Sequence, residues 1–179
     1  FGLWGKTITW NDKNNDGYLA VTEVCQDVGG CRAADTAVYV GPTTPTIEFA
    51  INPRIELLKR KLAISAQLDH KQGNLKFNNT LRHQCQGGQS CEGYWNPKAT
   101  LYSQARTIAV NNYSVYSGMY ENGRFTRLRE VAVTYTLPNR LANSVRASRA
   151  SVVLAGRNLH VWTPYTGVDP ETTVGNGDQ

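Results

Sequence analysis

The sequence contains no long run of apolar residues. No stretch approaches the ~18 to 20 continuous apolar residues that a membrane-spanning helix requires, so a helical membrane protein is excluded. The same absence does not exclude a β-barrel, because barrel strands alternate in polarity and leave only a weak hydropathy signal. The 179 residues are enough for one domain with a sizeable core, and we expect a single partial domain over residues 1–179.

The sequence also lacks the motifs that mark common enzymes. No Gly-x-Ser-x-Gly, His-Glu-x-x-His or phosphate-binding Walker loop occurs. The three histidines, His70, His83 and His160, fall on different expected elements. Asp169 and Glu171 flank a proline and are better interpreted as part of a loop than as a catalytic pair. We therefore predict that the chain is not an enzyme.

Charge of one sign is not concentrated anywhere in the chain. The formal net charge of +5 comes from 19 Lys and Arg against 14 Asp and Glu, and the basic residues are spread out without interleaved aromatics. This distribution argues against nucleic acid as a partner. The densest basic group, at residues 59–61, lies between two strand-like runs, where we interpret it as a solvated turn.

An initiator methionine and a secretory signal are missing as well. The chain begins at Phe1 with neither a charged n-region nor an apolar h-region, and residues 176–179 read as the middle of a loop. We expect the chain to be a fragment of a longer protein.

Cysteine is scarce, and the four cysteines form two close pairs. Cys25 and Cys31 are separated by five residues, as are Cys85 and Cys91, and both pairs lie in polar, glycine-containing segments. His83 lies near Cys85, but no set of neighbours has the spacing of a zinc site. Two local disulfides are therefore favoured over a metal site, and they indicate an oxidising compartment such as a periplasm or a cell surface.

The clearest periodic signal is an alternation of apolar and polar side chains. It runs through residues 47–57 and resumes over residues 62–68, which predicts a long antiparallel hairpin with a short basic turn at residues 58–60. Strands of about 10 residues suit a tilted membrane-spanning strand that has lipid on one face and a polar lumen on the other. A soluble sandwich with one wet face shows the same alternation, usually in strands of ~5 to 6 residues.

Two further strands are predicted at residues 124–136 and 150–163. A long irregular stretch at residues 82–123 separates them from the hairpin, and one short helix is expected within it at residues 99–109. Outer-membrane barrels combine short periplasmic turns with long extracellular loops in this way. We therefore predict an all-β fold, a partial antiparallel transmembrane β-barrel with long extracellular loops and a short loop helix, whose basic turn faces the periplasm.

Residues 12–23 have the spacing of a twelve-residue calcium loop. The preceding ten residues read as strand and not as helix, so an EF-hand fold is rejected. The loop is therefore either a calcium site between β-elements or a polar turn that binds nothing, and both interpretations stay open. Its candidate ligands, all oxygen donors that suit a hard cation, are Asp12, Asn14, Asp16, Glu23 and the carbonyl of Tyr18.

Three motifs follow one another near the end of the chain: Phe-Thr-Arg-Leu-Arg running to Tyr-Thr-Leu-Pro, then Gly-Arg-Asn-Leu, then Tyr-Thr-Gly-Val-Asp-Pro-Glu. In order and spacing they resemble the last portion of the SusC/RagA family of TonB-dependent transporters. An Asp-x-Asn-x-Asp-Gly loop and a Gly-x-x-x-Pro segment, at residues 12–17 and 41–45, extend the resemblance over most of the chain. The matching positions of the three motifs include Phe125, Arg127, Leu128, Tyr135, Pro138, Asn158, Leu159, Tyr165, Gly167, Asp169, Pro170 and Glu171.

The resemblance implies that this chain is the C-terminal part of a 22-stranded barrel in the bacterial outer membrane, without its plug domain and final strands. It also implies import of oligosaccharides or peptides, a SusD-like lipoprotein partner, outer-membrane lipid around the barrel, and energy from the TonB complex through the missing N-terminal part. Calcium is the one cofactor that the sequence suggests. Aromatic side chains in the outward loop would stack on sugar rings or anchor the barrel at the membrane interface; they are Tyr94, Trp95, Tyr113, Tyr116 and Tyr120.

Two other functions stay open on the sequence. A siderophore-type TonB-dependent receptor has the same architecture but carries a metal chelate and has no lipoprotein partner. A secreted calcium-binding β-domain with a carbohydrate-binding role would account for the loop at residues 12–23 and for the four cysteines.

Overall fold

The computed structural model describes residues 2–26, 31, 37–144 and 146–172, which form two compact units. The sheet unit comprises Ile47–Gln72 and Arg124–Thr163. The loop unit comprises Phe1–Thr46, Gly73–Gly123 and Pro164–Gln179. That the two units belong to one partial domain of a larger barrel stays a prediction.

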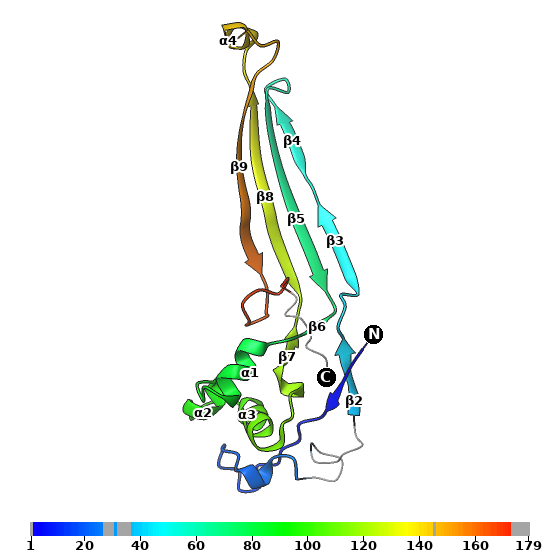
Figure 1. Cartoon of the computed structure of the whole chain (residues 1–179), viewed down its shortest axis with the longest axis vertical. Coiled ribbons are helices and arrows are strands. Elements are labelled where there is room, and N and C mark those ends of the chain that lie inside the picture. Colours follow the sequence, from blue (N-terminus) through cyan, green and yellow to red (C-terminus); the bar gives the residue numbers. More distant parts are fainter. Residues whose placement is uncertain (1, 27–30, 32–36, 145, 173–179) are drawn as a thin grey trace. The chain divides into compact units, whose positions relative to one another are not determined.

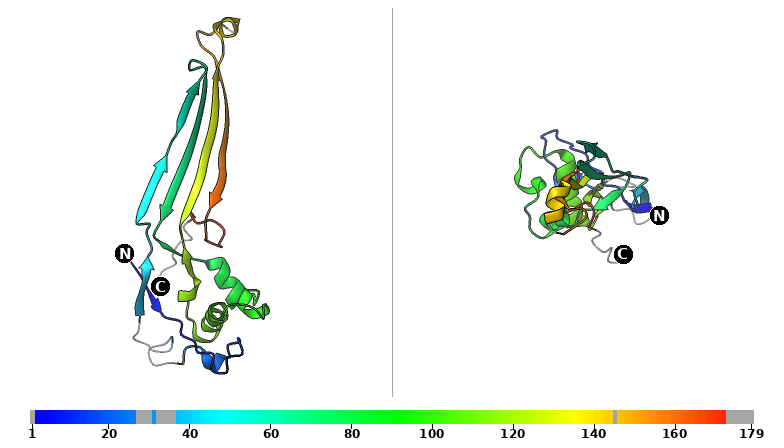
Figure 2. Two further views of the ribbon diagram at one scale, coloured as in Figure 1. Left: turned by 180° about the vertical axis from the view of Figure 1, so that it is seen from behind. Right: turned by 90° about the horizontal axis from the view of Figure 1, so that it is seen from above.

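The sheet unit is an antiparallel sheet of long strands (Figures 1 and 2). Its order is β3-β5-β8-β9, and β4 also pairs with β5. This confirms the predicted antiparallel β architecture and the positions of the last two strands. The strands are β3 (Ile47–Ile51), β4 (Arg54–Leu57), β5 (Leu62–Gln72), β8 (Phe125–Thr136) and β9 (Ser151–Trp162).

β3 and β4 act as one strand against β5. Ile51 pairs with Leu68 and Arg54 with Ser65, so the register crosses the break without a shift. Pro53 interrupts the ladder because it has no backbone N–H, although its carbonyl still accepts the amide of Ala66 at 3.0 Å. The predicted eleven-residue alternation is thus preserved as a single hairpin arm.

The hairpin closes through three consecutive residues with left-handed backbone conformation. Leu58, Lys59 and Arg60 have φ of 52°, 53° and 66°. None of them is glycine, so the turn carries some conformational cost. The short basic turn predicted from the sequence is confirmed, and at the same end of the sheet β8 and β9 are joined by a segment that holds the short helix α4 (Asn139–Ser144).

A β-bulge interrupts both ladders of β8 at one level. Leu128 pairs with Leu68 while Glu130 pairs with Gln67, so Arg129 is an extra residue. Opposite it, β9 carries two residues between Arg157 and His160. The extra residue returns Val131, Val133 and Tyr135 to the side of the sheet that Leu128 occupies, because one inserted residue reverses the alternation.

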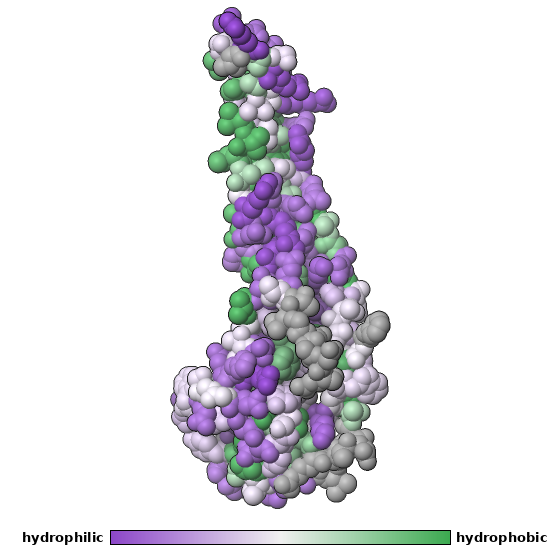
Figure 3. Space-filling view, viewed as in Figure 1, coloured by the Kyte–Doolittle hydropathy of each residue, from purple (hydrophilic) through white to green (hydrophobic). Residues whose placement is uncertain are grey.

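Register partners share a face, so the ladders sort the side chains of the sheet unit into two faces. In the view of Figure 3, hydrophilic side chains gather over the middle of this unit and hydrophobic ones project along its left margin. The mainly apolar face, here called the apolar face, carries Ile47, Phe49, Ile51, Ile55, Leu57, Leu62, Ile64, Leu68, Leu128, Val131, Val133, Tyr135, Val152, Leu154 and Trp162, and toward the Gln72 end of β5 also His70, Gln72, Thr126 and His160. The polar face carries Glu48, Arg54, Glu56, Ser65, Gln67, Asp69, Lys71, Arg127, Glu130, Thr134, Ser151 and Arg157.

The loop unit is built from short elements around one longer helix. The expectation of an irregular stretch at residues 82–123 with a single helix is wrong, because helices and a short strand occupy much of it. The elements are β1 (Gly2–Lys6) paired with β2 (Ala37–Pro42), β6 (Leu75–Phe77) paired with β7 (Tyr120–Asn122), the helices α1 (Asn79–Gln86), α2 (Glu92–Trp95) and α3 (Leu101–Tyr113), and the 3₁₀ turns η1 (Val21–Glu23) and η2 (Ser117–Met119).

Helix α3 is the expected loop helix, displaced from residues 99–109 to later positions. It starts after Thr100, whose side chain accepts the amide of Ser103 at 3.2 Å as an N-cap. It ends at Ser114, which adopts the left-handed conformation with φ 53°. The capping threonine, and not the alanine at position 99, therefore sets its beginning.

Two hydrophobic clusters pack on α3. One contains Ala105 and Ala109 of the helix and the Cys25–Cys31 pair, and the other contains Val110 and the Cys85–Cys91 pair. Gly93 of α2 lies so close to α3 that an added Cβ would stand 2.5 Å from the carbonyl oxygen of Ser103. The small size of the alanines and of this glycine lets the short elements pack tightly. Among the described residues, no helix has the length and apolar character needed to cross a membrane.

The bulge predicts a specific sensitivity at Asn158, which has φ 51°. Replacing Asn158 with valine should lower the free energy of unfolding by about 1–2 kcal/mol, because a β-branched residue tolerates this conformation poorly. Denaturant unfolding in detergent micelles measures the change. Asn158→Gly is the matched control and should stay close to the wild type; equal stability of the two variants would contradict a strained position.

Candidate functional site

The loop at residues 12–23 is held closed at its base. Trp10 and Val24 form an antiparallel bridge, the amide of Asn11 donates to the Glu23 carbonyl at 2.9 Å, and the amide of Cys25 donates to the Thr9 carbonyl at 2.8 Å. β1 precedes the loop, as the sequence predicted, and no helix stands there among the described residues. The loop is therefore a closed excursion from β-structure.

Inside the loop, side-chain oxygens accept backbone amides. Asp12 Oδ2 accepts the amide of Gly17 at 3.0 Å, and Asp16 Oδ1 accepts the amide of Tyr18 at 2.8 Å. Both carboxylate oxygens of Glu23 accept loop amides, at 2.9 and 3.1 Å. Gly17 has φ 81°, which glycine adopts without strain. The chain thus wraps around its own carboxylates.

Buried Gln104 fastens this loop to α3. Its side chain is 7% exposed, donates to the carbonyls of Gly17 and Ala99 at 2.9 and 3.0 Å, and accepts the amide of Leu19 at 2.9 Å. All three contacts leave the side-chain amide satisfied, as a buried polar group requires. Pattern reading missed Gln104, because a glutamine on a helix gives no sign of a partner 85 residues away.

The fit of the loop to a cation is mixed. Asp12 Oδ1 is shielded from solvent and has no hydrogen-bond partner, which suits a ligand oxygen. Against this, no group of three or more His, Cys, Asp or Glu side chains in the described part of the chain is arranged to hold a metal ion. The carboxylate of Glu23 would have to exchange its two amide bonds for a cation. Calcium binding by this loop stays a proposal.

The structure joins Cys25 to Cys31 and Cys85 to Cys91 in disulfides, with Cα atoms 4.8 and 4.9 Å apart. All four residues are at most 4% exposed. Each bridge closes a short segment against α3, on which both hydrophobic clusters depend. We propose that both bridges are formed in the protein at the cell surface.

The aromatic residues expected in the outward loop divide into two groups. Tyr94 and Trp95, on α2, are 42% and 66% exposed. The other three, Tyr113, Tyr116 and Tyr120, are half-buried and packed into the unit. Only the first pair therefore presents rings to solvent on a scale that stacking on a sugar or contacting a peptide would require.

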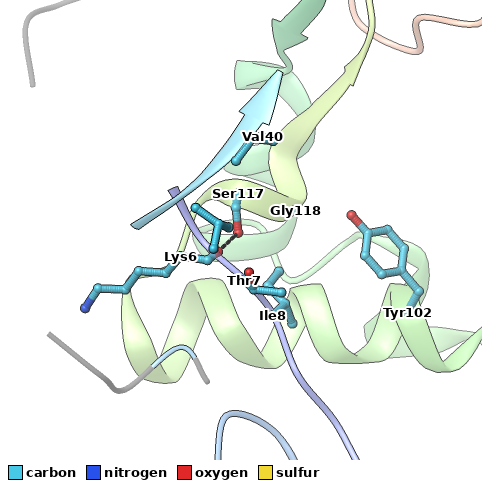
Figure 4. A pocket seen from close by; sticks show the side chains of 8 residues that line it. Lys6, Thr7, Ile8, Val40, Tyr102, Ser117 and Gly118 are labelled. Carbon is cyan, nitrogen blue, oxygen red and sulfur yellow. Dashed lines mark hydrogen bonds between the residues drawn. The ribbon is translucent and has the colours of Figure 1, made fainter. Parts of the chain in front are cut away.

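An open groove of about 200 Å³ lies between the β1–β2 ribbon, α3 and η2 (Figure 4). Ile8 and Val40 line it, Tyr102 forms one wall and Lys6 lies at its border. The hydroxyl of Ser117 donates to the Lys6 carbonyl and fixes the strand edge. Shallow and largely apolar, the groove offers a contact surface without groups arranged for chemistry.

The Tyr165–Glu171 motif packs onto the two-stranded β6–β7 sheet. Tyr165 is 7% exposed, and its hydroxyl donates to the Phe77 carbonyl at 3.1 Å. The hydroxyl of Thr166 donates to the Glu121 carboxylate at 2.9 Å. Lys76 Nζ donates to the Pro170 carbonyl at 2.6 Å. The motif is thus a docked segment of the loop unit, and its contacts depend on partners that sequence pattern did not identify.

Burial shifts the pKa of three groups in this part of the loop unit. Desolvation raises the pKa of Tyr120, and desolvation together with the Glu121 charge raises the pKa of Tyr165. Desolvation lowers the pKa of Lys76, and the charges of Asp169 and Glu171 oppose that shift.

Comparison with known proteins gives one curated relative and several related structures. TonB-dependent receptor P26 of Formosa agariphila is 24% identical over 170 residues, which are 90% of this chain and 16% of the receptor. The RagAB peptide importer matches in its closed-closed state with a TM-score of 0.65 and in its open-open state with a TM-score of 0.66, each at 20% identity over 94% of this chain. This chain spans 20% and 19% of the matched chains. No family model matches the sequence.

These matches confirm the resemblance to TonB-dependent transporters of the SusC/RagA type that the sequence motifs indicated. The likeness to the importer structures is one of fold. The matched proteins are receptors and importers, not enzymes, and proteins of this kind lie in the bacterial outer membrane, as predicted for this chain.

The loop at residues 12–23 gives a test for calcium. If it binds, terbium should luminesce on addition to the wild type and be displaced by calcium, and Asp12→Ala with Asp16→Ala should abolish the signal by removing two oxygen ligands. Asn15→Gly is the control, because position 15 supplies no ligand and its φ of 54° suits glycine. Absence of a signal in the wild type would identify the loop as a polar turn.

The raised tyrosine pKa values predict loss of stability in alkali. A tyrosine whose folded pKa exceeds its ordinary value of 10.0 contributes stability that is complete below that pH and lost as pH rises through the folded value. The lowered pKa of Lys76 acts in the opposite direction: it reduces stability while the lysine is charged, and this loss is recovered as pH rises toward 10.5. Above pH 10.5 Lys76 is neutral in both the folded and the unfolded state, so only the two tyrosines contribute there and stability falls with pH.

Tyr165→Phe should make this fall less steep, which unfolding measurements from about pH 8 to about pH 11 detect. The difference between the two proteins near pH 8 records the loss of the neutral hydroxyl, including its hydrogen bond to Phe77. An identical slope in wild type and variant would refute the contribution of Tyr165.

Proposed function

We propose that this chain forms part of the barrel wall and the extracellular layer of a SusC-type, TonB-dependent importer in the bacterial outer membrane. The observation behind the proposal is that the four-strand path of the sheet unit has one mainly apolar face and one mainly polar face, sustained over strands of 11 and 12 residues. Polar side chains enter the apolar face only toward the Gln72 end of β5, at His70, Thr126 and His160. Strands of this length and pattern fit a wall with lipid outside and a polar lumen inside.

The apolar face approaches the height of the apolar band of an outer-membrane barrel. Tyr135 lies at one end of it, opposite Leu62, and Trp162 lies at the other, on the level of His70. Between Leu62 and His70, β5 rises by roughly 26 Å at ~3.3 Å per residue, and a tilt of about 40° reduces this to roughly 20 Å. That height is close to the apolar band of ~25 Å in such barrels, so Tyr135 and Trp162 stand where interface aromatics are expected.

The exposure of these apolar side chains supports lipid as their partner. Leu154 is 76% exposed, Ile55 59% and Phe49 51%. A secreted domain would place this whole face in water, where an apolar patch of such extent is unfavourable. The secreted calcium-binding alternative is therefore the weaker proposal.

The edges of the sheet support a larger barrel. Within the described residues, β9 pairs only with β8, and β3 and β4 pair only with β5. Unpaired backbone groups are costly in lipid, so each edge needs a neighbouring strand. A closed barrel of 22 strands supplies those neighbours, and the small share of the matched chains that this chain covers leaves room for them.

The polar face suits a water-filled lumen. Ion pairs join Glu48 to Lys71 at 3.0 Å and Glu130 to Arg157 at 2.8 Å, and a closer pair joins Asp69 to Arg129. Exposed pairs of this kind add little stability each, but they keep the wall hydrated and nearly neutral. We infer that the short turn after β4 faces the periplasm and that residues 82–123 belong to the extracellular side.

The class of cargo is inferred from the comparison with RagAB and from the exposed rings of Tyr94 and Trp95. RagAB is a peptide importer composed of a SusC-like and a SusD-like component. We infer that this chain works with a SusD-like lipoprotein in the uptake of peptides or oligosaccharides, that Tyr94 and Trp95 contact the cargo, and that the TonB complex supplies energy through another part of the protein. A siderophore-type receptor would share the wall but not the motif at residues 165–171.

Adjacent residues of β9 test the membrane face. In the full-length transporter, Leu154→Arg should impair assembly in the outer membrane, because Leu154 lies on the apolar face at the level of Ile64. A lipid-facing arginine costs about 2–4 kcal/mol at the bilayer midplane and less toward the interface. Assembly is measured by fractionation and by the heat-modifiable mobility of the folded barrel, and uptake of labelled peptide should fall with it.

Val153→Arg is the matched control, since Val153 is also exposed, at 60%, but lies on the polar face. It should assemble like the wild type. Equal assembly of the two arginine variants would mean that the apolar face does not meet lipid.

A further inference from the structure

We propose that residues 165–172, here called the strap, form a lock that couples the segment after β9 to the beginning of helix α1, with Asn78 as the shared residue. This lock would keep the strap and the start of α1 in one conformation, a role separate from membrane insertion and import. Its basis is a set of contacts between segments that lie 43 to 96 residues apart in the sequence.

Asn78 is the centre of the lock. It is 1% exposed, and its side chain meets three different segments. The Oδ1 atom accepts the amide of Leu81 at 2.9 Å and so caps α1, while Nδ2 donates to Glu121 of β7 at 3.0 Å and to the hydroxyl of Thr166 in the strap at 2.9 Å. The buried side-chain amide of Asn78 thus forms hydrogen bonds with the start of α1, with β7 and with the strap at the same time.

Glu121 joins the same network from the strand. Its carboxylate accepts the Asn78 amide and both the backbone amide and the hydroxyl of Thr166, at 2.9 to 3.0 Å. Charge-assisted bonds of this kind are stronger than bonds between neutral groups. Removing Thr166 from the site would leave a carboxylate and a buried amide with unmet hydrogen bonds, which resists partial opening.

The strap is attached at two further points. Lys76 Nζ donates to the carbonyls of Pro170 and Thr172. At the other end of the strap, Tyr165 is buried, with 7% of the residue exposed. Gly167 allows this fold-back, because an added Cβ would stand 2.5 Å from the Tyr165 ring. Lys76, Phe77 and Asn78 are consecutive, so one stretch of chain holds the strap along its length.

The coupling reaches the disulfide-closed helices through α1. This helix is only 8 residues long and depends on its cap, since short helices are marginal without tertiary support. It carries Leu81 and Cys85 into the cluster that packs on α3. Release of the strap therefore loosens the start of α1 and, through it, the packing of that cluster.

Hydrogen exchange on the full-length transporter in detergent tests the lock. Thr166→Val removes the hydroxyl but keeps the shape of the side chain. It should raise exchange at the start of α1, including the Leu81 amide, about tenfold, which is the effect of losing one to two hydrogen bonds. Leu81 lies 85 positions before the mutated residue, so a purely local role of Thr166 would leave its exchange unchanged.

Thr172→Val is the matched control. The Thr172 hydroxyl bonds within the strap to the Asp169 carbonyl at 3.0 Å, and the bond from Lys76 uses the Thr172 backbone carbonyl. This variant should leave the Leu81 amide as slow as in the wild type. Unchanged exchange at Leu81 in Thr166→Val, or the same change in both variants, would overturn the proposal.

A second variant acts at the other end of the strap. Lys76→Met removes the bonds to Pro170 and Thr172 without touching Asn78. It should raise exchange both in the strap and at the start of α1, again severalfold. Faster exchange confined to the strap would show that the strap and the helix open independently, and the lock would be rejected even if Thr166→Val failed to assemble.

Discussion

The alternation of side chains along the long strands is the constraint on which the rest of this structure depends. A sheet that meets lipid on one face and water on the other has to keep every apolar residue on its own side, and a slip of one residue reverses the whole arm. The unbroken register from β3 through Pro53 into β4, against β5, is what makes the hairpin a single wall element. Among the described residues the outer edges at β9 and at β3–β4 pair with no further strand, and under the proposed function each of them needs a neighbouring strand.

The bulge at Arg129 shows how the sequence keeps this constraint. Without the extra residue, Val131 and Val133 would face the polar side while Leu128 faced lipid. The bulge also gives a physical meaning to two of the family-like motifs, since Leu128-Arg129 and Asn158-Leu159 lie at one level of the β8–β9 ladder. Their resemblance to the SusC/RagA family reflects the geometry of a strand pair, with Asn158 accepting the left-handed conformation that the bulge requires.

Sequence reasoning recovered the parts of the fold that repeat with a short period. The hairpin, β8 and β9 were predictable because a period of two is visible within a few residues, and α3 was predictable because it is long enough to show a helical face. Helix α1 was not, since its 8 residues follow a strand of only 3 residues and begin at a cap whose side chain serves distant partners. The roles of Gln104 and Asn78 were not predicted either, because they depend on hydrogen bonds to residues 85 and 88 positions away.

Several residues of the family-like motifs have roles in packing or backbone geometry. Arg127 and Tyr165 are buried, Asn158 shapes the bulge, and Gly167 lets the strap fold back on Tyr165. Side chains committed to backbone geometry and packing are poorly placed to distinguish one cargo from another. Under the proposed function, selectivity therefore falls to exposed residues outside the motifs. In the loop unit these include Tyr94 and Trp95 on α2, whose backbone is held against α3 by the close approach at Gly93.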